Sequence, residues 1–220
     1  MTSPLERAVA VMDRLRSPGG CPWDAAQTHE SLTRYLLEET YELIEAIETG
    51  DDELLREELG DLLLQVLFHA RLAEERPDGQ AFGIDEVATD LVDKLVRRHP
   101  HVFAGAESGT AEDLNATWEA QKIAEKGRTS AVDGVPIDQP ALALAAKLVS
   151  RANRAGIVPA DLAPAEPVAG DAAAEIGARL LAVVHDAVGL GVDPEGALRR
   201  AARAYRGAIV ASEDVPEVEH

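Results

Sequence analysis

Cysteine and long apolar segments are what this sequence has least of. Cys21 is its single cysteine, so no disulfide can form within the chain, as expected for a protein of the reducing cytosol. No charged-then-apolar leader opens the chain, and no apolar run approaches the roughly 18 residues of a membrane-spanning helix. We therefore expect a cytoplasmic protein that is neither secreted nor inserted in a membrane.

Basic and aromatic residues are also scarce. The 220 residues include 40 acidic and 21 basic ones, and the resulting net charge of −19 argues against a broad surface for nucleic-acid polymers. A small phosphorylated substrate is not excluded, provided that local cations and a metal offset the repulsion. Aromatic residues make up 4% and hydrophobic residues 46%, rich in Ala and Leu, a composition that supports a real core and favours helices.

Helical periods separated by Gly- and Pro-containing loops run along the chain, and no alternating segment is long enough for a sheet. The sequence therefore predicts an all-α helical bundle. The predicted helices cover residues 4–16, 28–49, 52–76, 84–99, 111–126, 140–155, 171–189 and 194–212.

A change of composition after Gly127 suggests a domain boundary. Residues 1–126 are predicted to form one helical domain, and residues 127–139, with Gly, Ser and Pro, a linker. Residues 140–212 are predicted to form a second helical part, followed by a frayed, flexible tail at 213–220.

Two short acidic pairs stand out on successive predicted helices. Glu39 and Glu42 lie three residues apart, as do Glu58 and Asp61, so each pair shares one helix face. A turn at 49–52 makes the two helices antiparallel neighbours, which brings the four carboxylates together. Like charges this close disfavour joint ionisation unless a cation lies among them. Oxygen ligands alone suit Mg²⁺, with Mn²⁺ as a substitute.

The same spacing is also common on solvated helix faces that bind no metal. Here apolar residues surround both pairs, and Arg56 is the one Lys or Arg between positions 35 and 70. Salt bridges within these helices therefore cannot compensate the acids, and carboxylates beside apolar surface are costly without partners. The pattern favours a metal site over a solvated acidic face.

These motifs together resemble the MazG-type nucleoside triphosphate pyrophosphohydrolases. Each motif alone would be weak, but their joint occurrence in the order of that family is highly specific. The matching elements, within about residues 5–126, are GCPWD at 20–24, EExxE at 38–42, ELGD at 58–61, KLxRRHPHVF at 94–103 and WExxK at 118–122.

The resemblance implies a fold of the all-α NTP pyrophosphatase type and Mg²⁺-dependent cleavage between the α and β phosphorus atoms. The products would be a nucleoside monophosphate and pyrophosphate, in house-cleaning or control of the nucleotide pool. We assign Glu39, Glu42, Glu58 and Asp61 to the metal, which would activate a water. Glu38 is turned about 100° away around the helix and could orient or deprotonate that water. Alternatively, Glu38 caps or solvates the helix.

Cationic residues further along the chain are candidates for the triphosphate. Lys94 and Arg98 share a helix face, and together with Arg97 they could clamp the phosphates. The alternative is a cationic helix C-terminus that the helix dipole favours. The family resemblance favours Lys94 and Arg98 over Arg97 as nucleotide contacts.

Two tryptophans and one further lysine complete the predicted substrate site. Trp118 and Lys122, one helical turn apart, could meet the base or the phosphates, although Trp118 could equally be a core residue. Trp23 could stack on a base or pin the GCPWD loop. Because aromatic stacking tolerates any base, the sequence does not reveal a base preference.

The second half contains what looks like a decayed copy of the acidic helix. Residues 175–183 align with residues 58–66 and share Glu, Gly, two leucines and a valine. Ala178 takes the place of Asp61 and cannot ligate a metal, and prolines occupy the place of a preceding EExxE helix. We predict that 140–212 is a degenerate, non-catalytic repeat; the alternative is that two Ala/Leu-rich helices align by composition alone.

Apolar surface left over beside the acidic helices predicts a homodimer, with residues 1–126 as the pairing surface. Three other functions compete with the general pyrophosphohydrolase. A di-iron bundle would need Glu-x-x-His motifs, and the one match, Glu217 to His220, lies in the tail. A nucleotide-sensing, non-catalytic scaffold would have a broken ligand set, whereas the first-half set is complete. A restricted dUTP or dCTP pyrophosphatase stays open.

Overall fold

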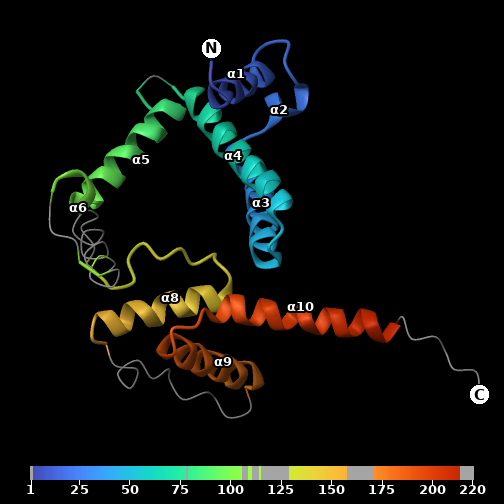
Figure 1. Ribbon diagram of the computed structural model, residues 1–220, viewed down its shortest axis with the longest axis vertical. Coiled ribbons are helices and arrows are strands. Elements are labelled where there is room, and N and C mark those ends of the chain that lie inside the picture. The colour runs from blue at the N-terminus through green and yellow to red at the C-terminus, as the bar shows by residue number, and fades with distance from the viewer. Residues whose placement is uncertain are drawn as a thin grey trace, which may run out of the picture. The chain divides into compact units, whose positions relative to one another are not determined.

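The computed structural model divides the chain into two compact units, residues 1–114 and 115–220 (Figure 1). All regular structure in the described residues is helical, which confirms the predicted all-α fold. None of these helices combines the length and the apolar character needed to cross a membrane. The residues that the structure describes are 2–77, 79–105, 109, 110, 114, 129–157 and 171–213.

The first unit begins with α1 (Pro4–Arg16) and the short α2 (Pro22–Ala26). In the loop between them, Gly19 has a φ of +78°, which favours glycine. Gly20 lies so close to the end of α1 that a Cβ there would be 2.2 Å from the carbonyl oxygen of Leu15. The two glycines of the loop therefore let the chain fold back flat against α1.

The long helices α3 (His29–Thr49) and α4 (Asp52–Glu74) form the predicted antiparallel hairpin (Figure 1). Gly50, with a φ of +72°, ends α3 in the left-handed conformation that few other residues adopt. Asp51 caps α4, because its Oδ1 accepts hydrogen bonds from the amides of Glu53 and Leu54, each 3.0 Å long. The turn residues thus set the two long helices side by side.

The hydrophobic core of the first unit lies where α1 packs against the hairpin. Tyr35 and Ile84 are partly buried against it, so the start of α5 also touches this core. Its buried members are Met12, Leu32, Leu67, Phe68 and Leu72. The core therefore lies towards the end of the hairpin opposite the Gly50 turn.

The helix α5 (Ile84–Arg98) buries none of its residues and is followed by the single turn of α6 (Pro100–Phe103). Pro100 ends α5 as predicted and is also the first residue of α6, a position that suits proline. The short helices α2 and α6 were not predicted from the sequence. Of the helix predicted at 111–126, the structure describes residue 114 alone.

The second unit contains α8 (Ala141–Arg154), α9 (Ala172–Gly189) and α10 (Pro194–Glu213), which pack against one another. Arg151 is buried and donates hydrogen bonds to the carbonyl oxygens of Ala131 (3.2 Å) and Asp133 (3.0 Å), which ties the chain before α8 to that helix. The predicted domain boundaries and the degenerate repeat stay predictions.

Candidate functional site

Three of the four predicted ligands meet in the middle of the α3–α4 hairpin. Glu39 comes from α3, and Glu58 and Asp61 come from one face of α4. One carboxylate oxygen of each lies within 4.8 Å of the other two. Glu58 is only 7% exposed, whereas Glu39 and Asp61 are half-buried. The cluster is thus closed on the helix side and open to solvent on the other.

The other two predicted acids flank this cluster. Glu42 is exposed and lies outside the group of three, yet its negative charge acts on both Glu39 and Glu58. Glu38 is exposed as well, and its charge acts on Glu39. The structure therefore brings three predicted ligands together and leaves Glu42 and Glu38 as neighbours at the rim.

Burial and the repulsion of neighbouring carboxylates raise the pKa of two of these acids, Glu39 and Glu58. Burial raises the pKa of Glu39, and the charges of Asp61, Glu42, Glu58 and Glu38 raise it further. Burial likewise raises the pKa of Glu58, with added repulsion from Glu42 and Asp61. A cation among the carboxylates would remove the repulsive contribution.

One oxygen of this cluster gives a direct test of whether a metal fits. Oε2 of Glu58 is buried and has no hydrogen-bond partner in the described part of the chain. A buried carboxylate oxygen without a donor is costly, and native proteins rarely leave one so. A hard divalent cation on the open side of the cluster would satisfy it with the oxygen ligands that Mg²⁺ prefers. The residues present therefore fit such an ion, and their role as ligands stays a prediction.

An aromatic pair lies one helical turn from the acids. Trp23, on α2, is 51% exposed and packs edge to face on Tyr35 with 5.8 Å between ring centroids. Gln27 donates a 2.9 Å hydrogen bond from its side chain to the Trp23 carbonyl oxygen. Tyr35 precedes Glu39 by four residues on α3, so the pair borders the acidic face. Both predicted roles of Trp23, stacking on a base and pinning the loop, suit this geometry.

The predicted phosphate-binding cations lie on the part of α5 that runs away from the acidic hairpin. Lys94, Arg97 and Arg98 lie in the last two turns of α5. This helix touches the core at Ile84, near its beginning, and Figure 1 shows its other end diverging from the α3–α4 hairpin. The other predicted substrate residues, Trp118 and Lys122, lie outside the described residues.

A buried amide one helical turn from Asp61 was not predicted from the sequence. Gln65 is 4% exposed, and its Oε1 has no hydrogen-bond partner among the described residues. It follows Asp61 by four residues and therefore shares the face of α4 that meets α3. That spacing is the signal that could have identified it inside an otherwise apolar run.

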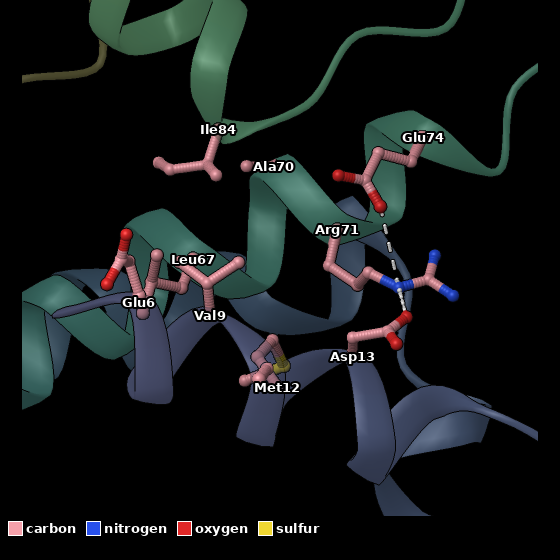
Figure 2. A pocket seen from close by; sticks show the side chains of 10 residues that line it. Glu6, Val9, Met12, Asp13, Leu67, Ala70, Arg71, Glu74 and Ile84 are labelled. Atoms are coloured by element: carbon pink, nitrogen blue, oxygen red, sulfur yellow. Dashed lines mark hydrogen bonds and ion pairs between the residues drawn. The ribbon is translucent and has the colours of Figure 1, made fainter. Parts of the chain in front are cut away.

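A second concave region lies apart from the acids, between α1, α4 and the start of α5. Figure 2 shows this pocket of about 320 Å³, with Val9, Met12 and Leu67 among its apolar residues. Three of its charged groups pair with one another: Nε of Arg71 lies 2.8 Å from Asp13 and 3.6 Å from Glu74. The lining of this pocket includes none of Glu39, Glu58 and Asp61.

The chain is similar to known proteins over most of its length. The family model of the MazG nucleotide pyrophosphohydrolase domain matches residues 27–103, which include both acidic pairs and the cationic end of α5. A nucleoside triphosphate pyrophosphohydrolase of Mycobacterium tuberculosis is 54% identical over 171 residues, 78% of this chain and 51% of the relative.

Two further relatives are covered over most of their own length. The nucleoside triphosphate pyrophosphohydrolase/pyrophosphatase MazG of Thermotoga maritima is 40% identical over 215 residues, 91% of this chain and 82% of the relative. An uncharacterized 26.1 kDa protein of Streptomyces cacaoi is 54% identical over 206 residues, 93% and 81% of the two chains. This chain thus spans about half of the mycobacterial relative and about four fifths of the other two.

Proposed function

Because this chain belongs to the MazG family of nucleotide pyrophosphohydrolases, we propose that it hydrolyses nucleoside triphosphates, ribo- and deoxyribonucleotides, to nucleoside monophosphate and pyrophosphate. The observation that carries the proposal is the cluster of Glu39, Glu58 and Asp61, in which one buried oxygen of Glu58 has no hydrogen-bond partner among the described residues. Such a cluster suits a divalent cation, and a triphosphate is a substrate that requires one.

The chain's own residues would divide the work as follows. Glu39, Glu58 and Asp61 would hold Mg²⁺, or Mn²⁺ in its place, with Glu42 at the rim as the fourth ligand. The ion would supply charge neutralisation for the phosphate oxygens and acidify a bound water. Glu38, exposed beside the cluster, would orient that water or accept its proton.

Substrate binding would draw on the cations and aromatic residues around the cluster. Lys94 and Arg98, with Arg97 beside them, would contact the triphosphate. Trp23 would contact the base from its exposed position next to Tyr35. Trp118 and Lys122 are proposed from the sequence motif alone.

A homodimer is part of the proposal for two reasons. Helix α5 exposes an apolar face, and the end of α5 that carries the cations runs away from the acidic hairpin. No residue of α5 is buried, and a row of its apolar side chains is exposed. A second copy pairing through the first unit would cover this row and could bring its own α5 cations to the acidic cluster. The exposed apolar residues of α5 are Val87, Leu91, Val92, Leu95 and Val96.

The expected role is house-cleaning or control of the nucleotide pool, in the cytoplasm where the single, free Cys21 suits a reducing environment. A restricted dUTP or dCTP pyrophosphatase would use the same acids and differ only in how the base is held. A nucleotide-sensing scaffold would bind triphosphate without turnover.

The test is to incubate the protein with each NTP and dNTP, with Mg²⁺ or with excess chelator, and to follow products by phosphorus NMR in ¹⁸O-water. We expect monophosphate and pyrophosphate, no orthophosphate at early times, and no turnover in chelator. Early orthophosphate would indicate attack at the γ phosphorus and would reject the proposal. Turnover of only dUTP or dCTP would establish the restricted enzyme, and binding without products would establish the scaffold.

A further inference from the structure

The last residue of α1 is Arg16, whose side chain contacts three separate segments of the first unit. The side chain of Arg16 is only 4% exposed. Its Nε and Nη2 donate to the two carboxylate oxygens of Glu75, at 3.0 and 2.8 Å. Its remaining Nη1 donates to the carbonyl oxygen of Asp24 and, at 3.4 Å, to that of Gln27. The guanidinium carbon also lies 5.4 Å from the ring centre of Phe68.

These contacts replace the hydrophobic anchor that α2 lacks. The five residues of α2 include none that is buried, and no side chain caps its beginning. A helix this short has little stability of its own. Arg16 donates to carbonyl oxygens at the end of α2, where a helix presents unsatisfied acceptors and favours positive charge. A single guanidinium thus joins α1, α2 and the end of α4.

Glu75 fixes the direction in which this guanidinium points. It binds Arg16 through both oxygens, and Nη1 of Arg71 approaches it to 3.2 Å from the preceding turn of α4. The hydrogen bond and charge of Arg16, together with the charge of Arg71, hold the pKa of Glu75 below its usual range. The carboxylate of Glu75 therefore stays ionised. It binds Nε and Nη2 of Arg16, so Nη1 is the nitrogen that is left to bind the carbonyl oxygens of Asp24 and Gln27.

The contacts of Arg16 with Glu75 and with the α2 carbonyl oxygens form a clamp, and this clamp holds Trp23 in place. This residue is in the second position of α2, and its ring rests on Tyr35, one turn before Glu39. Movement of α2 would therefore displace Trp23 relative to Tyr35 and the acidic cluster, which both lie on the hairpin. We propose that Arg16, oriented by Glu75, is a positioning residue for nucleotide binding, because it holds Trp23 against Tyr35 where the substrate meets the acids. This inference rests on the proposed function.

Lysine should not substitute for arginine in this role. A guanidinium offers donors in three fixed directions and a flat face for Phe68, whereas an ammonium is a compact point charge. In Arg16→Lys the ion pair with Glu75 can persist, but the contacts with the α2 carbonyls are lost. In Glu75→Gln the guanidinium is retained and loses its orienting charge.

The experiment compares these two variants in the full chain with Asp13→Asn as a matched control. Asp13 pairs with Arg71 at 2.8 Å and so also joins α1 to α4, but among the described residues its side chain has no hydrogen bond or ion pair with residues 17–27. We expect Arg16→Lys and Glu75→Gln to raise KM for a triphosphate about tenfold, with kcat within about twofold of the wild type, as for loss of binding without loss of chemistry. Asp13→Asn should leave KM unchanged. If Arg16→Lys does not fold, Glu75→Gln carries the comparison.

A second readout does not depend on turnover. In a Trp118→Phe background Trp23 is the one tryptophan of the chain, so its fluorescence reports on α2 alone. Both clamp variants should increase acrylamide quenching of Trp23, and Asp13→Asn should not. A wild-type KM in variants with increased quenching would overturn the inference, as would an equal rise of KM in Asp13→Asn or unchanged quenching in both clamp variants. Absence of any hydrolysis by the wild type would instead reject the proposed function, while the quenching result would still test the clamp.

Discussion

The α3–α4 hairpin and helix α9 carry similar sequence patterns, but only the hairpin encloses its acids. Both α4 and α9 begin with an aspartate cap, Asp51 and Asp171, whose side chains accept from two backbone amides. Glu58 is the seventh residue of α4 and is buried against α3. Glu175, which aligns with it, is the fourth residue of α9 and is exposed. The local pattern therefore does not make the site; burial between two helices does.

The buried acids of the hairpin and the exposed Glu175 of α9 should differ in how strongly a divalent cation stabilises them. In the hairpin, burial and the charges of neighbouring carboxylates raise the pKa of Glu39 and Glu58. In α9, Ala178 stands where Asp61 stands in α4, and Val184 is the one buried residue of the helix. A solvated carboxylate such as Glu175 gains little from a divalent cation.

The largest expected effect that separates the two regions is on turnover. Glu58→Gln should reduce kcat by about three orders of magnitude, because a neutral amide ligates Mg²⁺ poorly and several kcal/mol of charge stabilisation is lost. The helix content by circular dichroism should stay at the wild-type level. Steady-state hydrolysis measures the effect, with Glu57→Gln as control, because Glu57 is the exposed neighbour on the same helix. Full activity of Glu58→Gln would contradict the assignment of the cluster.

The hairpin is the part of this molecule that its sequence predicts best. The 3.6-residue period of apolar residues predicted the ends of α3 and α4 to within two residues. A long amphipathic helix repeats this period over many positions, so single exceptions do not obscure it. Gly50 and Asp51 are strong turn and cap residues, so the antiparallel pairing followed. From that pairing, the meeting of Glu39, Glu58 and Asp61 follows geometrically.

Other features had no local signal. The helices α2 and α6 are five and four residues long, too short for a period, and each begins with a proline that usually indicates a break. Arg16 binds Glu75 across 59 positions of sequence, a contact that only the packed structure provides. The exposed position of Glu42 was missed because three-residue spacing gives the face but not the depth of a side chain.

A smaller effect concerns stability without metal. A raised carboxyl pKa means that the folded state binds the proton more tightly than the unfolded chain. This contribution to stability is present below the ordinary Glu pKa of 4.5 and is lost as the pH rises through the raised values. At neutral pH the metal-free cluster is therefore destabilising, and Mg²⁺ should raise the Tm.

Calorimetry or circular dichroism with and without Mg²⁺ measures this effect. We expect a rise of about 2–4 °C for each kcal/mol of binding in the wild type. Glu58→Gln should respond weakly to Mg²⁺ and should melt above the metal-free wild type, because one repelling charge is gone. Glu175→Gln should respond like the wild type. Equal responses of Glu58→Gln and wild type would contradict a metal site between α3 and α4.

The hairpin should also respond to acid through a histidine pair near the beginning of α3. Nδ1 of His29 lies 2.8 Å from Nδ1 of His69, and the 5.1 Å between centroids equals that distance plus the two ring radii. The rings therefore meet edge to edge in one plane, which suits a linear N–H···N bond. Arg76 donates to Nε2 of His29 at 3.2 Å, so the proton of His29 is on Nδ1 and is shared with His69.

Burial, and then the neighbouring His29, lower the pKa of His69. The unfolded chain binds this proton more tightly, so the contribution of the pair is present above the ordinary His pKa of 6.5 and is lost as the pH falls below it. Urea midpoints between pH 7.5 and about 5 should fall in the wild type and fall less in His69→Gln. Hydrogen bonds to its own backbone amide and to Thr28, and then the charge of His29, lower the pKa of Glu30. Its negative charge beside His29 favours protonation of the folded pair, so Glu30→Gln should steepen the fall. A wild-type pH slope in His69→Gln would contradict this account.

The smallest expected effect is the one on which the comparison of the two regions depends most. Glu175→Gln should leave kcat and KM within about twofold of the wild type, because an exposed surface carboxylate contributes little. Hydrolysis assays alongside Glu58→Gln give the ratio of the two effects directly. If Glu175→Gln removed activity as thoroughly as Glu58→Gln does, the second unit would be part of the catalytic machinery and no relic. The burial of Glu58 between α3 and α4 would then not be the property that distinguishes a catalytic carboxylate from a non-catalytic one such as Glu175.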